Sequence, residues 1–331
     1  MGLEALLLAK IKLVKEERAK KEILSEIQQE LQGHASDFAR ILELAERGKV
    51  IRIIQEQADF PTAHNAYVEW KERRPTNITT GFQTFDNLTD NYDYGEIITI
   101  MGRPVTGKTF CALNILERLL NQVTDKIGFF SLEMSKAGII ERMMQLFFGL
   151  SRWELNRKRL VNELDEEKFF EKYGDLNIYS RIYTVREIEK LVERDGLKII
   201  FIDYLQLIRE DYGRGLYEQT SAKMREIKEL AKNKEVVVFL MSQISRKGEG
   251  GWTPVTIDMA RDSGAIEENS DFIIGIWDPY LEENVGQEWE GKIMLKLIKN
   301  KRGVIRAIEC NRDRSSGKLY ELEIERGCLI S

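Results

Sequence analysis

Apolar runs suited to buried strands alternate with helical segments between about Thr76 and Glu290. The expected strands are Ile97–Met101, Lys126–Ser131, Lys198–Asp203, Val236–Met241 and Phe272–Trp277. The expected helices are Lys108–Asn121, Lys136–Phe148, Val185–Arg194 and Tyr217–Lys232. Alternation of this kind predicts an α/β fold with a mainly parallel central sheet and helices on both faces.

After Glu290 the pattern changes to closely spaced strands separated by short turn-rich segments. The expected strands here are Ile293–Ile298, Val304–Cys310 and Lys318–Ile324. Short turns connect antiparallel neighbours, so we expect these strands to extend one edge of the sheet in antiparallel fashion.

Residues 1–75 lack strand-like runs and carry charged helical patterns punctuated by Gly33, Gly48 and Pro61. Two sets of apolar residues recur there at helical spacing, Leu7, Ile11 and Val14, and then Leu24, Ile27 and Leu31. We therefore expect a small helical appendage over 1–75 and one larger domain over 76–331. The amphipathic helix could pack on its own domain or on a neighbouring subunit, and the pattern does not choose between them.

Composition narrows the functional classes. Among 331 residues, 50 basic and 55 acidic side chains give a net charge of −5, so a polyanion must be held by a local basic patch. The three cysteines, Cys111, Cys310 and Cys328, are too scattered for a zinc or disulfide framework, and His34 and His64 are the only histidines. No apolar run approaches the ~20 residues of a membrane span, and the start lacks a signal pattern. These features predict a soluble, cytoplasmic protein that does not enter a membrane.

The stretch from Gly102 to Thr109 fills the pattern G-x-x-x-x-G-K-[ST]. It follows an expected strand and precedes the apolar helix that begins near Phe110, which is the context that a phosphate-binding loop requires. Glycines let successive backbone N–H groups turn toward a phosphate, and the helix adds its positive N-terminal end. Lys108 would then reach the β- and γ-phosphates, and the Thr109 hydroxyl would bind magnesium.

Polar residues close three of the other expected strands. Ligands of open α/β sheets lie at the carboxyl ends of strands. Asp203 ends an apolar strand as a magnesium-orienting carboxylate would. Glu133 could hold an attacking water and accept its proton, and Gln243 could sense the γ-phosphate. Each position taken alone is equally compatible with a solvated or helix-capping role, but together with the phosphate loop they indicate a nucleotide hydrolase.

The order of these motifs resembles the ATPase domain of DnaB-type replicative DNA helicases. The resemblance covers nearly all of the chain from residue 76 onward. It is carried by Thr80-Gly81-Phe82 with Phe85-Asp86, the phosphate loop, Ser131-Leu132-Glu133-Met134, Ile202-Asp203-Tyr204-Leu205-Gln206-Leu207, Ser242-Gln243-Ile244-Ser245-Arg246, Arg261-Asp262-Ser263-Gly264-Ala265-Ile266-Glu267 and Lys299-Asn300-Lys301-Arg302-Gly303.

This resemblance implies a RecA-like fold assembled as a hexameric ring, with ATP and Mg²⁺ between subunits and single-stranded DNA in the centre. It implies that Glu133 is the catalytic base, that Asp203 and Thr109 support the metal, and that Gln243 couples nucleotide state to DNA. The implied nucleotide-binding residues are Gly102, Arg103, Pro104, Val105, Thr106, Gly107, Lys108, Thr109 and Phe110.

The glycine-rich segment from Ser245 to Gly264 is similar to the central-channel DNA loop of this family. Its expected DNA-binding residues are Arg246, Lys247, Arg261, Asp262, Ser263 and Gly264. Glycines allow the backbone to approach phosphates closely while a few cations supply charge. Glycine richness alone would favour a mobile surface excursion, and the match over Arg261–Gly264 favours the DNA loop.

The chain departs from the family pattern in two places. The family's Lys-x-Arg-x-Gly element places a lysine and an arginine at the neighbour's γ-phosphate, whereas Lys301 occupies the arginine position here and Arg302 follows one residue later. Lys299 matches the family's lysine. Arg302 would need an irregular backbone to serve as the finger, and Lys301 could not form a bidentate fork. Secondly, the first 75 residues leave room for little beyond a linker helix, so a primase or helicase loader as partner is not assured.

We expect an ATP-dependent, ring-forming helicase that moves 5′ to 3′ on single-stranded DNA and separates forked duplex, in a bacterial cytoplasm or a bacteriophage-infected cell. One alternative is a RecA-like ATPase that binds DNA for recombination or loading without processive unwinding. Another is a ring-forming binding module in which nucleotide only holds subunits together, although the intact Lys108, Thr109, Glu133 and Asp203 argue against it.

Overall fold

The computed structural model describes residues 60–72, 76–209, 215–244, 252–259, 264–281 and 286–322. The chain divides into two compact units, Met1–Arg74 and Pro75–Ser331. In the first unit the described part is the helix α3 (Phe60–Glu72), whose residues are all exposed. Rings follow one another along α3 in tilted pairs, with 5.9 Å between the ring centroids of Tyr67 and Trp70. The helical patterns expected before residue 60 lie outside the described residues.

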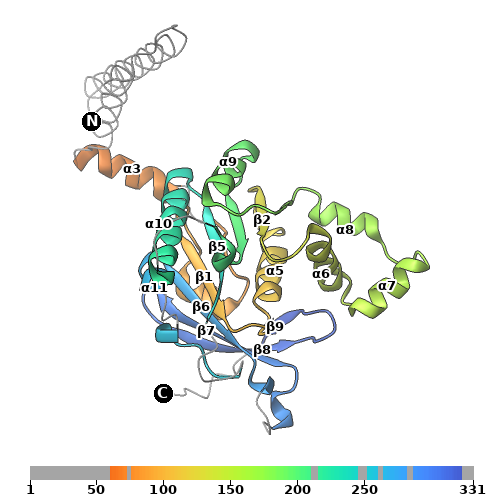
Figure 1. Ribbon diagram of the computed structural model, residues 1–331. Coiled ribbons are helices and arrows are strands. Elements are labelled where there is room, and N and C mark those ends of the chain that lie inside the picture. Colours follow the sequence, from red (N-terminus) through yellow and green to blue (C-terminus); the bar gives the residue numbers. More distant parts are fainter. Residues whose placement is uncertain are drawn as a thin grey trace. The chain divides into compact units, whose positions relative to one another are not determined.

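The second unit is built on a nine-stranded sheet in the order β3-β2-β4-β5-β1-β6-β7-β8-β9. Strands β1 to β6 pair in parallel, and β7 to β9 join β6 in antiparallel pairing (Figure 1). The strands are β1 (Ile97–Gly102), β2 (Ile127–Ser131), β3 (Asn177–Ser180), β4 (Ile199–Asp203), β5 (Val237–Gln243), β6 (Phe272–Trp277), β7 (Lys292–Asn300), β8 (Arg306–Arg312) and β9 (Leu319–Glu321). The predicted parallel sheet and its antiparallel extension are therefore confirmed.

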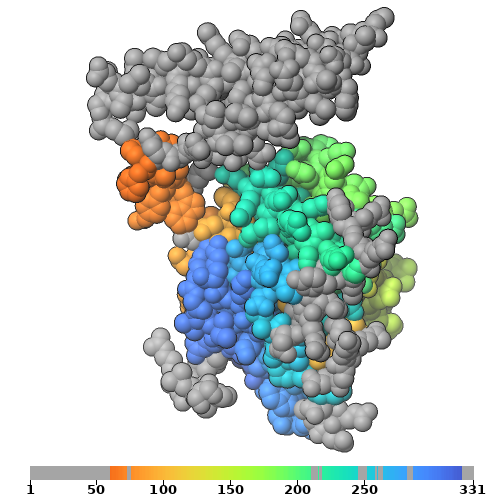
Figure 2. Space-filling model, turned by 60° about the vertical axis from the view of Figure 1, so that its left-hand side comes forward, coloured from red at the N-terminus to blue at the C-terminus, as the bar shows by residue number. Residues whose placement is uncertain are grey.

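Helices cover both faces of the sheet, as Figure 1 shows for α5 and α6 on one side and α10 and α11 on the other. The helices of this unit are α4 (Gln83–Thr89), α5 (Lys108–Leu119), α6 (Lys136–Phe148), α7 (Arg152–Leu160), α8 (Glu166–Tyr173), α9 (Val185–Asp195), α10 (Leu216–Lys234) and α11 (Gly264–Asn269). Short 3₁₀ turns occupy Leu205–Leu207, Ile257–Met259, Pro279–Leu281 and Gln287–Trp289. Figure 2 shows the surface of the C-terminal strands in blue beside a lighter blue area that includes α11.

The central strands are apolar throughout because both of their faces are buried. Alternate residues of β1 enter different cores: Ile98 and Ile100 pack with α5 and α6, while Ile97 and Met101 pack with α9 and α10. Strands buried on both faces read as continuous hydrophobic runs in the sequence. This is why the bounds of the five expected parallel strands lie within two residues of the observed ones.

Side chains at the helix ends explain where several helices begin. The Ser135 hydroxyl accepts a hydrogen bond from the Gly138 N–H at the start of α6, and Thr184 and Glu187 form a reciprocal capping box at α9. Such caps satisfy backbone donors that have no partner within the helix. Glycines with a left-handed backbone, Gly149 and Gly196, then end α6 and α9.

The structure differs from the expected elements at less regular places. Strand β3 and helices α4, α7 and α8 were not expected, since they are short and their apolar residues are few. The expected strand from Val304 begins instead at Arg306, because Val304 and Ile305 belong to the exposed turn after β7. The end of the expected strand Lys318–Ile324 lies outside the described residues.

Candidate functional site

The phosphate loop connects the end of β1 to the start of α5. Gly102 closes β1 in a crowded position, where a Cβ atom would lie 2.6 Å from a methyl carbon of Ile276. Gly107 has φ +96° and forms the N-cap of α5. Glycine adopts this left-handed conformation without the Cβ clash that other residues suffer. The loop therefore directs the positive N-terminal end of α5 toward the space above it, as phosphate binding requires.

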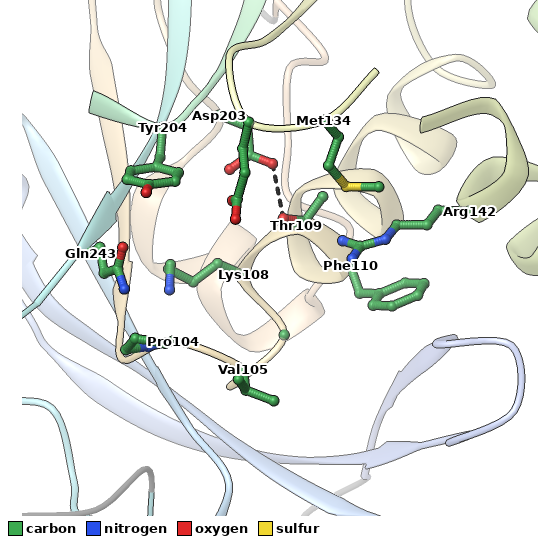
Figure 3. A pocket seen from close by; sticks show the side chains of 12 residues that line it. Pro104, Val105, Lys108, Thr109, Phe110, Met134, Arg142, Asp203, Tyr204 and Gln243 are labelled. Carbon is green, nitrogen blue, oxygen red and sulfur yellow. Dashed lines mark hydrogen bonds between the residues drawn. The ribbon is translucent and has the colours of Figure 1, made fainter. Parts of the chain in front are cut away.

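A cavity of about 380 Å³ opens above this loop at the carboxyl ends of the strands (Figure 3). Its lining combines residues from the loop, from the segment after β2 and from the ends of β4 and β5. These residues are Pro104, Val105, Gly107, Lys108, Thr109, Phe110, Glu133, Met134, Arg142, Asp203, Tyr204 and Gln243. The structure thus brings together five residues that are far apart in the sequence: Lys108, Thr109, Glu133, Asp203 and Gln243.

Lys108 lies across the loop. Its ammonium donates hydrogen bonds to the backbone carbonyls of Gly102 at 2.9 Å and Arg103 at 2.7 Å. Burial lowers the pKa of Lys108 from 10.5 to about 8, while the nearby Asp203 and Glu133 act in the opposite direction. A buried cation bonded to neutral carbonyls gains strongly from an incoming phosphate, because the phosphate supplies the countercharge.

Thr109 and Asp203 form a pair of oxygen ligands at the edge of the cavity. The Thr109 hydroxyl donates to a carboxylate oxygen of Asp203 at 2.8 Å (Figure 3). Burial raises the pKa of Asp203, and the hydrogen bond from Thr109 opposes that rise. Mg²⁺ prefers hard oxygen ligands and commonly takes one or two protein ligands together with substrate phosphates. These two residues fit that requirement, and across the described ranges no cluster of three or more His, Cys, Asp or Glu residues suits a metal ion.

Glu133 and Gln243 approach the cavity from the ends of β2 and β5, the two strands on either side of β4. Glu133 is exposed at the second position after β2, and Gln243 is the last residue of β5, in register with Gly102 of β1. The backbone of Gln243 is held by the Gln206 side chain, which donates to its carbonyl at 2.9 Å and accepts from its N–H at 3.1 Å. The Gln243 side chain points into the cavity together with Lys108 (Figure 3).

Sequence reasoning missed three residues that line the cavity, Arg142, Met134 and Tyr204. The guanidinium of Arg142 lies 5.0 Å from the ring centroid of Phe110 (Figure 3). Arg142 sits in the middle of α6, so no strand end marks it. A signal was nevertheless present, because α6 begins three residues after Glu133 and Arg142 is its one cation after the first residue, Lys136.

Three of the residues predicted to bind nucleotide, Gly102, Arg103 and Thr106, are not among those that line this cavity. Gly102 and Thr106 are buried beneath the loop, and Thr106 donates to the Arg103 carbonyl at 2.8 Å. The Arg103 side chain is 5% exposed and faces Thr253 and Met259. These residues shape the loop rather than its open surface.

Lys299 and Arg302 lie at the other end of the sheet. Because β7 is antiparallel to β6, its last residue Asn300 pairs with Phe272, the first residue of β6. The carboxyl end of β7 therefore falls at the amino ends of the parallel strands. Lys299 donates from its ammonium to the Glu267 carbonyl there.

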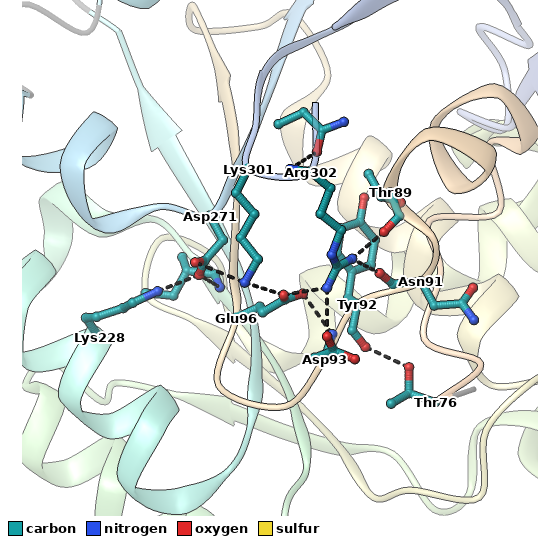
Figure 4. A network of polar contacts seen from close by, with 12 residues as sticks. Thr76, Thr89, Asn91, Tyr92, Asp93, Glu96, Lys228, Asp271, Lys301 and Arg302 are labelled. Carbon is teal, nitrogen blue, oxygen red and sulfur yellow. Dashed lines mark hydrogen bonds and ion pairs between the residues drawn. The ribbon is translucent and has the colours of Figure 1, made fainter. Parts of the chain in front are cut away.

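Arg302 belongs to a buried polar network at this amino edge (Figure 4). Its guanidinium donates to the backbone carbonyls of Thr89 and Asn91 and pairs with the carboxylates of Asp93 and Glu96. The same group lies 5.1 Å from the centroid of the Phe272 ring.

Lys301 joins the network from its more exposed side. Its ammonium pairs with Glu96 and Asp271, and Asp271 also pairs with Lys228 of α10 (Figure 4). The side chain of Lys301 is 39% exposed, compared with 19% for Arg302. Burial raises the pKa of Glu96 although both cations stabilise its charged form. Within one copy of the chain, Arg302 is thus occupied by a structural network.

Of the expected DNA loop, Ser245 to Gly264, the structure describes the segment 252–259 and Gly264. Arg246, Lys247, Arg261, Asp262 and Ser263 lie outside the described residues, and Gly264 is the first residue of α11. The segment 252–259 precedes α11 and carries the buried Val255.

Cys111 and Cys310 are buried free thiols. No helix in the described segments is long and apolar enough to cross a bilayer.

The chain is similar to known replication proteins over most of its length. The family described as the DnaB-like helicase C terminal domain matches residues 77–320. A probable plasmid replicative DNA helicase of Chlamydia muridarum is 29% identical over 277 residues, which are 78% of this chain and 59% of that protein. The replicative DNA helicase DnaB of Geobacillus stearothermophilus is 28% identical over 288 residues, covering 82% and 61%.

A solved structure described as a DnaB-like replicative helicase and its interactions with primase shares the fold. It superposes with a TM-score of 0.71 at 21% identity, over 95% of this chain and 78% of the other. The chain spans about three fifths of the length of the curated relatives it matches. The family match, the RecA-like sheet order and the residues gathered around the phosphate loop agree, and the chain belongs to the family of DnaB-like helicase C-terminal domains.

Proposed function

We propose that this chain is an ATP-dependent replicative DNA helicase that forms a ring and moves 5′ to 3′ on single-stranded DNA. The observation that carries the proposal is the cavity in which Lys108, the Thr109–Asp203 pair and Glu133 converge. A nucleotide hydrolase needs a phosphate cation, metal ligands and a base at one place. The named relatives, which are replicative helicases, supply the DNA substrate of the proposal.

In the proposed reaction the phosphate loop binds the triphosphate and Lys108 leaves its carbonyl partners for the β- and γ-phosphates. Thr109 and Asp203 would hold Mg²⁺, which neutralises charge on the phosphates when bound. Glu133 orients a water molecule and accepts its proton as the water attacks the γ-phosphorus, while the bond from that phosphorus to the β–γ bridging oxygen breaks and ADP leaves with phosphate as the other product. Arg142 lines the same cavity and adds a cation on the side of α6.

The exposed position of Glu133 suits a base that must reach a substrate water. We expect Glu133→Gln to retain nucleotide binding and to lower the hydrolysis rate roughly 10²- to 10⁴-fold, the range usual for a lost general base. Single-turnover hydrolysis and binding of a fluorescent nucleotide separate the two effects. Unchanged turnover would remove Glu133 from the role of base.

Assembly as a hexamer is part of the proposal. The described cavity of one copy is lined by neither Lys299 nor Lys301, so a role for these lysines at a nucleotide requires a neighbouring copy. We propose that these lysines, at the opposite edge of the sheet, face the nucleotide of a neighbouring copy. Arg302 is a weaker candidate, since its guanidinium already binds two carbonyls and two carboxylates.

Mixed rings test the arrangement in trans. A Lys108→Ala subunit lacks its own site but retains its lysines, so adding it to Lys299→Ala or Lys301→Ala protein should restore part of the lost hydrolysis. Absence of any restoration would place these lysines outside the neighbouring site.

Strand separation tests the function as a whole. Wild-type protein with ATP should unwind a forked duplex that carries a free 5′ tail, and Lys108→Ala should not. A substrate with only a 3′ tail is the polarity control. DNA-stimulated hydrolysis without unwinding would favour the loading or recombination ATPase, and nucleotide-dependent assembly without hydrolysis would favour the binding module. Primase or a loader as partner is a separate proposal, tested by binding to the full chain.

A further inference from the structure

The side chain of Arg103 points away from the nucleotide cavity. It is 5% exposed, and its Nη1 donates to the backbone carbonyl of Thr253 at 3.1 Å. Its Nη2 lies 3.8 Å from the sulfur of Met259. Arg103 of the phosphate loop therefore holds both ends of the segment 252–259, about 150 positions further along the chain.

That segment is the return limb of the expected DNA loop, and it is anchored in the core. Val255 is fully buried against Gly275 of β6, where a Cβ atom would lie 2.8 Å from the Cβ of Val255. The limb that leaves β5 is held at Gln243 by Gln206. The residues on both sides of 245–251 are thus fixed at the carboxyl edge of the sheet, and those that leave β5 lie beside the nucleotide cavity.

The backbone of Arg103 contacts the nucleotide-binding lysine. Its carbonyl accepts hydrogen bonds from the Lys108 ammonium at 2.7 Å and from the Thr106 hydroxyl at 2.8 Å. A phosphate that draws the Lys108 ammonium away removes a charged donor from this carbonyl. Since charge-assisted hydrogen bonds are the strong ones, the peptide that carries Arg103 is sensitive to the presence of nucleotide.

We propose that Arg103 is a positioning residue that couples the phosphate loop to the segment 252–259, and through it couples nucleotide binding to DNA binding. The proposal rests on the proposed function for its DNA half. Its nucleotide half stands on the contacts of Arg103 alone. The coupling element is a packed side chain with partners on both sides, which is the physical form that such coupling requires.

Hydrogen exchange of the full chain tests the nucleotide half without DNA. A non-hydrolysable ATP analogue with Mg²⁺ should change the exchange of peptides that cover 252–259 in the wild type. In Arg103→Met, which keeps an unbranched apolar stem but has no donors, the analogue should leave these peptides unchanged while the phosphate-loop peptides still respond. Arg186→Met makes the same change at an exposed arginine of α9 and should behave like the wild type.

Hydrolysis with and without a thymidine oligonucleotide tests the DNA half. We expect the ratio of stimulated to basal rates to be roughly fivefold or more in the wild type and below about twofold in Arg103→Met, whatever the basal rate of the variant. Arg103→Lys keeps the charge without the fork, and we expect an intermediate ratio. A merely structural role would lower the melting temperature and leave this ratio unchanged.

Several outcomes overturn the inference. One is an exchange of 252–259 that does not respond to nucleotide in the wild type, a result that needs no variant to fold. Another is a full response in Arg103→Met. If oligonucleotide fails to stimulate the wild type while the exchange response depends on Arg103, the helicase proposal fails and the coupling stands.

Discussion

Charged side chains at the two edges of the central sheet have different partners: neutral groups at the carboxyl edge and opposite charges at the amino edge. At the carboxyl edge Lys108 bonds to backbone carbonyls and Asp203 to the hydroxyl of Thr109. At the amino edge Arg302 pairs with Asp93 and Glu96, and Asp271 pairs with Lys228 and Lys301.

The pKa values reflect this difference. Burial lowers the pKa of Lys108 to about 8 and raises that of Asp203. Burial also acts to raise the pKa of Asp271, but its hydrogen bonds to Lys228 and to the Ile97 N–H outweigh it and the pKa is lowered. Glu96 is the exception, since its burial raises its pKa in spite of two cations.

The carboxyl edge is suited to binding charged ligands, and the amino edge is suited to stabilising the fold. Burying a charge beside neutral partners costs free energy that an oppositely charged ligand can return. A network already balanced in charge offers no such gain, and it joins the β6–β7 edge to the loop before β1. We therefore expect changes at the carboxyl edge to affect activity and a change at Arg302 of the amino edge to affect stability. Lys299 and Lys301 are separate, because we propose that they act at the nucleotide of a neighbouring copy.

The largest effect should follow Lys108→Ala. Loss of a cation from the phosphate site should lower kcat/KM for ATP on the order of a thousandfold, the upper range for removing one transition-state donor. Steady-state hydrolysis measures it, with Lys136→Ala at the exposed start of α6 as the control. Hydrolysis at a normal rate by Lys108→Ala would contradict the site assignment.

Arg302→Ala should be next, and should act on stability. This change removes the cation that pairs with Asp93 and one of the two cations that pair with Glu96, at a cost of about 3 kcal/mol in the free energy of unfolding. Urea unfolding measures the change. Arg194→Ala, which breaks a pair with Asp195 at the surface, should change the free energy of unfolding much less, because solvent screens that pair. Equal losses in both variants would show that the amino edge is not a special structural element.

The pH dependence of nucleotide binding should report Lys108. With a pKa of about 8 the free protein loses the ammonium proton as pH rises, so affinity should fall above pH 8. The limiting slope is about tenfold per pH unit for one proton. Titration of a fluorescent ATP analogue between neutral pH and pH 9.5 measures it, and Lys108→Arg, which keeps its charge, is the control. A flat wild-type profile over this range would mean that bound phosphate is not the partner of Lys108.

The smallest effect should come from a position remote from both edges. Thr184→Ala removes the hydroxyl that caps α9 and should cost about 1 kcal/mol of stability, with kcat/KM for ATP unchanged. This variant sets the scale of a purely local loss. If Thr184→Ala lowered kcat/KM for ATP by more than its loss of stability explains, a residue remote from both edges would also affect activity. The contrast between the two edges would then not hold.

Much of the fold could be predicted because its periodicities are local. Five parallel strands and four of the covering helices follow from apolar runs and helical spacing. Strand β3, with four residues, and helices α4, α7 and α8 could not, since short elements with few buried residues carry little periodic signal. The site residues at strand ends, Asp203 and Gln243, were predicted for a topological reason, while Arg142 in mid-helix was not.

Residue type and spacing were sufficient to place a phosphate loop after one buried strand, Asp203 at the end of another and Glu133 just after a third. The direction in which individual cations point depends on the tertiary structure. Arg103 lies in the nucleotide loop yet its side chain holds the segment 252–259, and Arg302 lies in a finger-like motif yet binds Glu96 and Asp93. Long arginine side chains take the partners that packing brings within reach, and those partners come from distant parts of the chain.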